Sequence, residues 1–408
     1  MLDRHNPEAK ELVASAQDMI PHLRERALEC QTSGRIPESS MQEMLERRLF
    51  DITKPKRYGG LELGWDVFAE VAIRISAGCG SSGWVYSVLA QHPLFANRIG
   101  IDFMDEAWGE NPDALFAATK FQNGTGAFKK VDGGYLGYGI STFGSGSLHS
   151  DWVLEGGAPV EGSDEKVICM VPVRDLEIRD TWNPDGLEGT GSHHVKLDGC
   201  FIPAHRARSP GKPPSGGIVD APLYRTTGLG VPFGLSVVLI GIAMNALEIF
   251  AEDMKHRKSR DGTRIADLQS LQMRVGESAA EIDAATNSVR MHLKALMETL
   301  KSLPPPTGAG GYEHGKWPDY IGMGIENGKW PAPGTGDDSP HLGLANSFAA
   351  QLAYSAIQRL AYAAGASQLD RDNALHRCFR DATAGVRQYG INWDVARTRA
   401  GQSFLGVN

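Results

Sequence analysis

The spacing of apolar positions changes twice along the chain and divides it into three parts. Between residues 8 and 98, apolar residues recur every three or four positions, which is typical of amphipathic helices; we expect these helices near 8–30, 37–49, 64–78 and 81–98. From residue 115 onward, short runs rich in β-branched and aromatic residues alternate with Gly, Asp and Pro turns. These runs predict strands near 115–121, 126–131, 134–143, 151–157, 166–173, 176–182 and 193–201.

A Pro- and Gly-rich linker at 209–222 ends the strand region, after which helical spacing returns. Long segments with an apolar stripe predict a helix bundle, with helices near 228–257, 265–302, 342–364, 372–389 and 392–403. The expected fold is therefore of the α+β class. It has an N-terminal helical domain at 1–113, a middle antiparallel β-barrel or sandwich at 114–222, and a C-terminal helix bundle at 223–408.

Residues 303–340 fit none of these elements. The segment holds seven prolines and nine glycines around Tyr312, Trp317, Tyr320 and Trp330. A loop of this length without secondary structure is uncommon in a compact domain and is often functional. The four aromatic residues argue against plain disorder. Packing at a subunit interface and a lid over an active site are both open for this insertion.

Composition and charge exclude several partner classes. The net charge of −8 and the pI near 5.9 argue against nucleic acid or an anionic membrane as the main partner. No apolar run reaches the roughly 20 residues of a membrane helix, and the first residues show no apolar signal core, so we expect a cytoplasmic protein. The five cysteines are scattered and odd in number, which predicts reduced thiols and no metal site.

Residues 139–152 form a Gly- and Ser-rich stretch that follows a predicted strand. Glycines at 144 and 146 would permit positive φ and close approach of a flat ligand. Hydroxyls that can bond a ring nitrogen or carbonyl come from Ser141, Thr142, Ser145 and Ser147. Taken alone, this stretch is also what an ordinary hairpin loop would contain.

The same stretch resembles the flavin-contacting strand and loop of two-component flavin-dependent monooxygenases, in the acyl-CoA dehydrogenase superfamily. These proteins tend to read Gly-Arg-Trp-Ser-Phe-x-Ser-Gly-x-x-His-x-x-Trp, and the chain matches without a gap at Gly139, Phe143, Ser145, Gly146, His149 and Trp152. Further stretches resemble the family in the same order, at 55–60, 82–92, 186–192, 201–203 and 375–381. The resemblance covers nearly the whole chain.

The resemblance implies the oxygenase component of such a system. That component uses reduced flavin, FMNH2 or FADH2, and O2, and acts through a C4a-hydroperoxyflavin on a small aromatic or N- or S-containing substrate. A separate NAD(P)H:flavin reductase would supply the flavin, since the chain has no Gly-x-Gly-x-x-Gly after a strand and no Walker-type loop. The helix, sheet and bundle order agrees with this superfamily, whose members are commonly homotetramers.

Site residues follow from the matched motifs. His92 matches a histidine that faces the flavin and is expected to position the hydroperoxide or move a proton. Trp84 is expected beside the cavity, and Phe143, Gly144, Ser145 and Gly146 are expected to hold the flavin edge. Gly144 stands where relatives often carry a Ser or Thr that contacts flavin N5, so the Ser145 hydroxyl or a backbone amide is expected to replace that contact.

The chain differs from the family pattern at two further positions of the site, 141 and 388. Ser141 replaces the tryptophan of this strand and is expected to enlarge the cavity or to admit a bulkier ring. Gln388 replaces a histidine of many relatives, and it can exchange hydrogen bonds but cannot take a proton. Either His92 works alone or the substrate needs no strong base. The stretch 189–192 is expected to border the flavin ring or to form a tight turn.

Arginines provide candidates for binding the flavin phosphate. Arg257 and Arg260 belong to a basic cluster at the end of a predicted helix, where a dipole-matching helix cap is the alternative. Arg377 would contact the cofactor across a subunit boundary, with a structural network around Arg380 and Asp381 as the alternative.

Two rival functions stay open. Acyl-CoA dehydrogenases often carry a catalytic glutamate near the position of Tyr389, whereas this chain has no carboxylate there before Asp394. A non-catalytic flavin-binding relative is the second alternative, and the replacements at Gly144 and Gln388 favour it.

Overall fold

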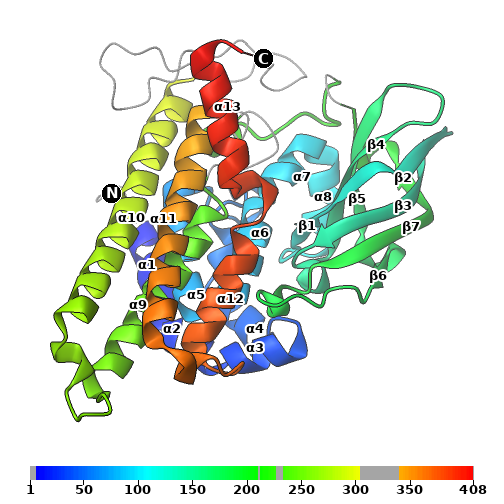
Figure 1. The fold of residues 1–408 in the computed structure, drawn as a ribbon. Coiled ribbons are helices and arrows are strands. Elements are labelled where there is room, and N and C mark those ends of the chain that lie inside the picture. Colours follow the sequence, from blue (N-terminus) through cyan, green and yellow to red (C-terminus); the bar gives the residue numbers. More distant parts are fainter. Residues whose placement is uncertain (1–5, 210–211, 227–232, 304–339, 408) are drawn as a thin grey trace.

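The computed structural model describes residues 6–209, 212–226, 233–303 and 340–407. The predicted insertion therefore lies almost entirely outside the described residues. The first part of the chain is helical (Figure 1), with α1 (Pro7–Asp18), α2 (Ile20–Glu25), α3 (Ala27–Ser33), α4 (Glu38–Glu46), α5 (Trp65–Gly78), α6 (Gly80–Gln91), α7 (Pro93–Ile99) and α8 (Ile101–Glu110).

Two predicted helices are divided in the structure at three breaks, and proline lies at two of them; the third break, at Arg26 between α2 and α3, has none. Pro93 begins α7 directly after His92, so the helix expected at 81–98 is two helices. Pro21 lies in the first turn of α2, after the end of α1. Proline has no N–H to donate to the preceding turn, so it suits a helix start and interrupts a helix interior.

The middle of the chain forms two four-stranded sheets. Their strands are β1 (Phe116–Ala118), β2 (Lys120–Val131), β3 (Gly134–Gly144), β4 (Trp152–Pro159), β5 (Lys166–Pro172), β6 (Glu177–Arg179), β7 (His193–Pro203) and β8 (Ala207–Arg208). The orders are β1-β4-β5-β8 and β2-β3-β7-β6, and every pair is antiparallel except β1 with β4. Phe121, Phe128 and Leu197 belong to an apolar core formed by strands of both sheets.

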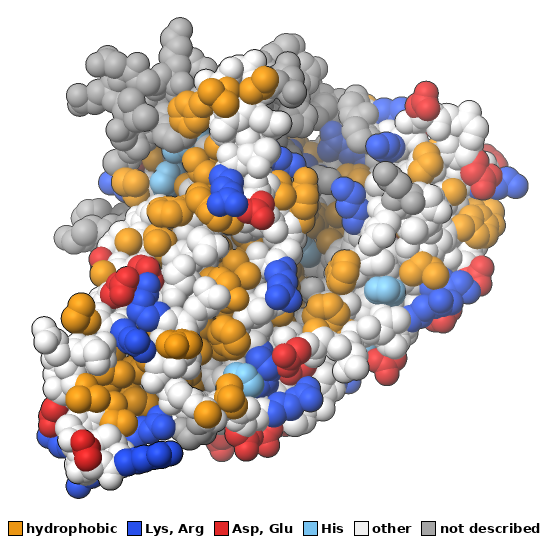
Figure 2. All heavy atoms as spheres, in the orientation of Figure 1, with side chains coloured by type: hydrophobic (Ala, Val, Ile, Leu, Met, Phe, Trp, Pro, Cys, Tyr) orange, Lys and Arg blue, Asp and Glu red, His pale blue; other side chains and the backbone are white. Residues whose placement is uncertain are grey.

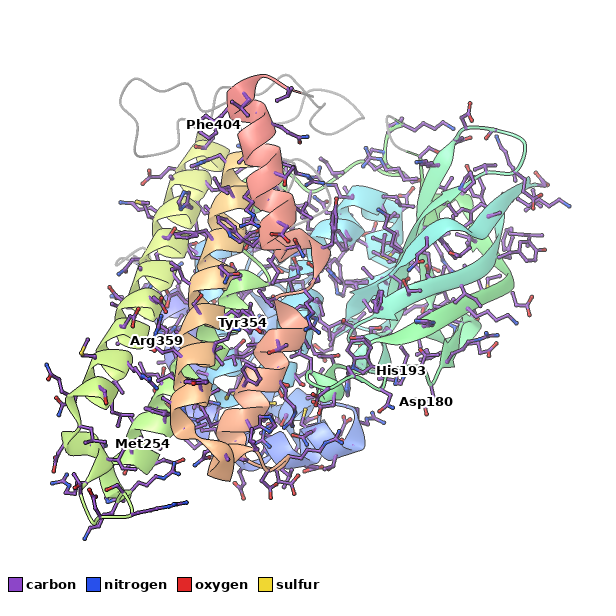
Figure 3. All side chains as sticks on the ribbon, in the orientation of Figure 1. Asp180, His193, Met254, Tyr354, Arg359 and Phe404 are labelled. Carbon is purple, nitrogen blue, oxygen red and sulfur yellow. The ribbon has the colours of Figure 1, made fainter. Side chains whose placement is uncertain are left out.

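The last part consists of α9 (Ser236–His256), α10 (Gln269–Ser302), α11 (Pro340–Ala364), α12 (Ala374–Gly385) and α13 (Trp393–Leu405). α9 packs closely on α5 at Gly241, which has no Cβ. A Cβ at this position would lie only 2.3 Å from the Ile73 carbonyl oxygen. Arg359 of α11 pairs with Glu281 of α10 through two bonds of 2.6 and 2.8 Å (Figure 3). One continuous apolar core includes side chains of both helical parts.

The observed architecture confirms the expected fold class. The helices stand together on one side and the sheets on the other (Figure 1), so the long C-terminal helices and the early helices share one body. Figure 2 shows apolar side chains over the outer face of α10, α11 and α12. Within the described part of the chain, no helix is both long and apolar enough to cross a bilayer.

Candidate active site

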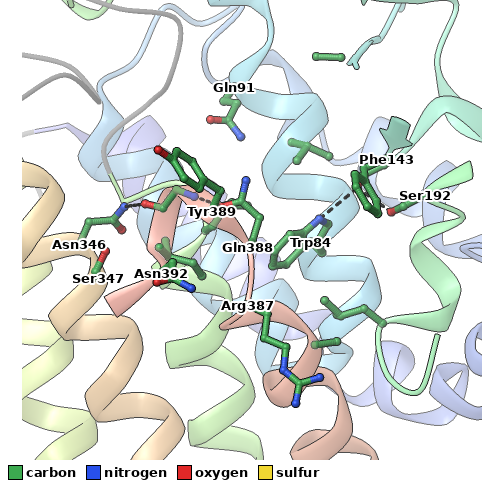
Figure 4. Close-up of a pocket in the computed structure, with 18 of the residues that line it drawn as sticks. Trp84, Gln91, Phe143, Ser192, Asn346, Ser347, Arg387, Gln388, Tyr389 and Asn392 are labelled. Carbon is green, nitrogen blue, oxygen red and sulfur yellow. Dashed lines mark hydrogen bonds between the residues drawn. The ribbon is translucent and has the colours of Figure 1, made fainter. Parts of the chain in front are cut away.

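A cavity of about 820 Å³ is lined by residues from both helical parts and from the sheets. One side is formed by α6, by the loop that follows β3 and by the 3₁₀ turn Glu188–Thr190. The other side is formed by the start of α11, by the connection between α12 and α13, and by α13 itself (Figure 4). The volume lies within the range of small-molecule and cofactor sites.

The end of β3 presents one aromatic ring at the cavity. Phe143 has a φ of 61° and is 58% exposed, an uncommon combination for a large apolar residue. Gly146 has a φ of 76° and approaches Leu89 of α6. Of the two glycines that could permit a positive φ, only Gly146 has one, and the other positive angle here falls on Phe143. A Cβ on Gly144 would lie 3.1 Å from Thr119 Cγ2, which is a tight contact.

Among the four hydroxyl residues of this stretch, Ser145 alone lines the described cavity. Trp84 Nε1 of α6 donates to Ser145 Oγ at 3.3 Å, and Ser145 Oγ lies 2.6 Å from Ser192 Oγ. Figure 4 shows Trp84, Phe143 and Ser192 together on one side of the cavity. Four predicted residues, Trp84, His92, Phe143 and Ser145, thus line one cavity.

His92 ends α6 and is 5% exposed. Its Nδ1 lies 2.6 Å from the Phe116 carbonyl oxygen, and since a carbonyl only accepts, Nδ1 carries the proton. The ring also stacks on Phe95, with centroids 4.5 Å apart. Burial lowers the pKa of His92 to about 4, although the hydrogen bond to Phe116 opposes this. At neutral pH His92 is therefore uncharged, and its Nε2 is a hydrogen-bond acceptor.

Gln388 lies across the cavity, in the connection between α12 and α13 (Figure 4). Its Oε1 accepts from the Gly390 amide at 2.5 Å and caps the 3₁₀ turn Tyr389–Ile391. Its amide nitrogen can donate to a ligand and the second lone pair of Oε1 can still accept, but the side chain cannot take a proton. Arg399 of α13 donates to the Tyr389 hydroxyl at 2.9 Å on the same side.

Ser141 does not enlarge the cavity, so that expectation is wrong. Ser141 is fully buried between strands, and its hydroxyl lies 2.9 Å from Thr119 Oγ1 and 2.9 Å from Glu155 Oε1. Glu155 is also fully buried, and burial raises its pKa to about 8 against the opposing hydrogen bonds of Thr119 and Ser141. Ser141 thus hydrogen-bonds a buried carboxyl group between the strands, in the space that a tryptophan side chain would occupy.

The three predicted phosphate-binding arginines lie away from the cavity of their own chain. Arg257 follows α9 and donates to the Ala364 carbonyl oxygen at 2.7 Å, where α11 ends. Arg260 is exposed in the turn beyond it. Arg377 is half-buried on α12, near Cys79 and Asp381. Phosphate binding by these residues stays a prediction that requires a second copy of the chain.

The remaining motif residues have structural contacts. His149 Nε2 accepts from the Ile36 amide at 3.2 Å, and Trp152 is buried against Phe103. Arg380 pairs with Asp185 at 3.2 Å, while Asp381 accepts from the Leu187 amide at 2.7 Å. The turn from 189 to 192 borders the cavity through Thr190 and Ser192, and its contact with the flavin ring stays a prediction.

Several lining residues had no signal in the sequence. They come from three separate stretches, as Trp182, Asn346, Tyr389, Asn392 and Arg399. Among the described residues that line the cavity, none is an aspartate or glutamate. The described wall thus holds no carboxylate to remove a proton α to a thioester, which is the task of the base in an acyl-CoA dehydrogenase.

Comparison with known proteins gives the family. Residues 6–100 match the model described as the acyl-CoA dehydrogenase N-terminal domain, and residues 233–305 and 333–393 match the model of the C-terminal domain. The FADH(2)-dependent resorcinol hydroxylase oxygenase component of Rhizobium sp. (strain MTP-10005) is 28% identical over 415 residues, which cover 97% of this chain and 94% of that protein.

Two further relatives agree with this assignment. The flavin-dependent monooxygenase oxygenase subunit HsaA of Rhodococcus jostii (strain RHA1) is 30% identical over 281 residues, covering 65% of this chain and 72% of that protein. XiaF from Streptomyces sp., solved with FADH2 and glycerol, has a TM-score of 0.81 at 26% identity and covers 98% of this chain and 96% of its own. The chain therefore belongs to the acyl-CoA dehydrogenase superfamily and, within it, to the oxygenase components of two-component flavin-dependent monooxygenases.

Proposed function

We propose that this cavity binds reduced FMN or FAD with the reactive edge of the ring at residues 143–146, and that the chain oxygenates a small aromatic compound beside it. The observation that carries this proposal is the hydrogen bond from Trp84 Nε1 to Ser145 Oγ beside a cavity that the uncharged ring of His92 also lines. The residues fit a reduced flavin, whose N5–H needs an acceptor such as the Ser145 hydroxyl. When bound, the flavin supplies the electrons that activate O2 and transfers one oxygen atom to the substrate.

His92 is proposed to accept a proton or hydrogen bond from the substrate. Its Nδ1 is held by Phe116, so Nε2 is the nitrogen that has a free lone pair for the cavity. A neutral imidazole held in one tautomer can take the proton of a phenol or orient the hydroxyl that loses it. Because the Gln388 amide cannot take a proton, His92 is the base available on the described wall, and Gln388 is proposed to orient the substrate.

Water exclusion is the other requirement of this chemistry, because activated oxygen is lost as peroxide where water enters. The α6 and α7 side of the cavity, which includes His92, holds buried aromatic side chains, among them Trp84 at 7% exposure and Phe95 at 8%. The opposite side, around Tyr389 at 65% exposure, is open in a single chain. We therefore place the oxygen transfer at the His92 end and substrate entry at the Tyr389 side.

The partners of the chain follow from the same proposal. A separate NAD(P)H:flavin reductase supplies the reduced flavin, as the two-component relatives require. The relatives named above include a resorcinol hydroxylase, which supports a hydroxylated aromatic ring as the substrate. We propose a homotetramer assembled through the C-terminal helices. The five free cysteines, four of them buried, support the proposed place in a reducing cytoplasm.

Rapid mixing tests the proposed function. The protein is loaded anaerobically with FMNH2 and, separately, with FADH2, and is then mixed with oxygenated buffer while absorbance is recorded. The proposal predicts a persistent transient spectrum before oxidised flavin appears, with the longer lifetime identifying the preferred flavin. Immediate formation of oxidised flavin, together with bleaching of oxidised flavin by an acyl-CoA, would assign a dehydrogenase instead.

A His92→Ala variant tests the catalytic group. Product formation should fall by about 10²- to 10⁴-fold, the usual contribution of a positioned acid or base, while reduced flavin still binds. Oxygen consumption should then appear as peroxide. An unchanged rate of oxygenation would refute the role of His92 without affecting the family assignment.

A further inference from the structure

Three hydroxyl groups form a continuous chain along the wall of the cavity behind Phe143. Trp84 Nε1 donates to Ser145 Oγ at 3.3 Å, and the oxygens of Ser145 and Ser192 are 2.6 Å apart. The chain continues from Ser192 to Thr190 over 2.7 Å, and Thr190 Oγ1 donates to the Leu187 carbonyl oxygen at 2.9 Å. Thr190 and Ser192 are 2% and 3% exposed, so bulk water competes little for these bonds.

Both ends of this chain have a fixed polarity. The indole N–H of Trp84 can only donate, and the Leu187 carbonyl can only accept. Between them each hydroxyl has one proton, so all four bonds form at once only when every proton points from Trp84 towards Leu187. Ser145 then donates to Ser192, and Ser192 donates to Thr190. Each hydroxyl keeps one lone pair and no proton for a ligand in the cavity.

The Leu187 end is held by the surrounding fold. Leu187 has a φ of 54°, and its amide donates to the buried Asp381 carboxyl of α12 at 2.7 Å. Its carbonyl oxygen also accepts from Trp182 Nε1 at 3.1 Å. The carbonyl oxygen accepts three hydrogen bonds, from Trp182 Nε1, the Thr190 amide and Thr190 Oγ1, which makes it a firm end point for the direction of the hydroxyl protons.

We propose that Ser192 and Thr190 are positioning residues that hold the Ser145 hydroxyl as an acceptor towards the cavity and thereby make the site selective for reduced over oxidised flavin. Reduced flavin carries a hydrogen on N5 and donates it, whereas N5 of oxidised flavin has a lone pair and needs a donor. A Ser145 hydroxyl that donates its hydrogen bond to Ser192 can accept from N5–H of reduced flavin. The same hydroxyl repels the N5 lone pair of oxidised flavin. This inference rests on the proposed placement of the flavin edge at residues 143–146.

Equilibrium binding tests the inference without turnover. The dissociation constants of oxidised and of dithionite-reduced FMN, and likewise FAD, are measured anaerobically for wild type, Ser192→Ala and Thr190→Val. The ratio of the oxidised to the reduced constant should fall about five-fold in Ser192→Ala, the effect of about one hydrogen bond. A ten-fold change would shift the two-electron potential of the bound flavin by about 30 mV.

Two controls separate positioning from folding. Ser192→Thr keeps the hydroxyl and should keep the wild-type ratio. Ser147→Ala removes a buried hydroxyl from the same loop that has no hydrogen-bond partner and does not line the cavity, so the ratio should not move. If Ser192→Ala does not fold, Thr190→Val carries the test, because it removes the group that accepts the Ser192 proton.

The outcomes distinguish this inference from the proposed function. Weakening of both flavin states by the same factor, or an unchanged ratio in both variants, would overturn the positioning role. Failure of the wild-type protein to bind either flavin would instead overturn the proposed function. A lowered ratio in Ser192→Ala that Ser192→Thr restores supports the inference.

Discussion

His92 is a buried imidazole whose charge state connects stability to pH. Its ordinary pKa of 6.5 falls to about 4 in the folded chain, mainly through burial. Between these values the unfolded chain binds more protons than the folded chain, so the free energy of unfolding falls as pH drops from about 6.5 to 4. In His92→Gln this loss should be smaller by about 1–3 kcal/mol. Denaturant titrations at several pH values check this, with the exposed His256→Gln as control.

Glu155 should act in the opposite direction. Its pKa is raised from 4.5 to about 8 because the carboxyl is buried between strands. From about pH 4.5 to 8 the folded chain holds the extra proton, so stability falls as pH rises. The decline should be shallower by roughly 1–3 kcal/mol in Glu155→Gln, which has nothing to titrate. Equal slopes for wild type and variant, with exposed Glu161→Gln as reference, would contradict the buried neutral carboxyl.

At the residue scale, motif positions could be predicted and hydrogen-bond partners could not. Trp84, His92, Phe143 and Ser145 line one cavity, as their motifs indicated. The contact between Ser145 and Ser192 spans 47 positions and depends on how β3 and the 3₁₀ turn at 188–190 meet. Single-residue patterns contain no information on such a contact, which is also why Ser141 was assigned to the cavity and Glu155 was overlooked.

At the scale of elements, Glu70 joins α5 to α10. Its carboxylate is 5% exposed and bonds Arg290 at 2.5 Å and Arg74 at 2.7 Å. Glu70→Ala should reduce the free energy of unfolding by about 1–3 kcal/mol, below the usual cost of breaking a buried pair because Arg290 is 39% exposed. Chemical denaturation measures the loss. Glu298→Ala on exposed α10 surface serves as the control and should change stability by less than about 0.5 kcal/mol.

The order of helices and strands could be predicted from the periodicity of the sequence, whereas the exact ends of some helices could not. The strand runs agree with β3, β4, β5 and β7 to within about two residues, because each run ends at a turn-forming residue. The helix expected over 81–98 ends early since Pro93 cannot donate to the preceding turn. The break places His92 at the junction of α6 and α7, where its ring reaches Phe116.

For the whole molecule, the cavity depends on parts far apart in the sequence. Its walls come from α6, from the sheets and from the end of the chain, so no local pattern could predict residues such as Asn346 or Arg399. The common core of the two helical parts holds these walls together. The Tyr389 side remains exposed in one chain, and a neighbouring copy is the simplest means of covering it.

Assembly into a tetramer is the prediction that belongs to this scale. Large apolar side chains are exposed on α10 and α11 (Figure 2). Tyr362 of α11 is 82% exposed and Met273 of α10 is 66% exposed. Light scattering should give four times the chain mass of 44.1 kDa. Tyr362→Glu combined with Met273→Glu should lower this mass, because a charge would be buried without a partner.

The same variant tests where the flavin phosphate is bound. Arg257, Arg260 and Arg377 lie away from the cavity of their own chain, so any of them that binds phosphate must act on a neighbouring copy. Loss of assembly should then weaken binding of reduced flavin by at least ten-fold, whereas Phe201→Glu, on the exposed face of β7, should leave both mass and binding unchanged. If the dissociated chain bound flavin as tightly as the assembly, the phosphate site would lie within one chain and the three arginines would be structural. Dissociation by Phe201→Glu instead would move the interface to the sheets and exclude assembly through the helix bundle.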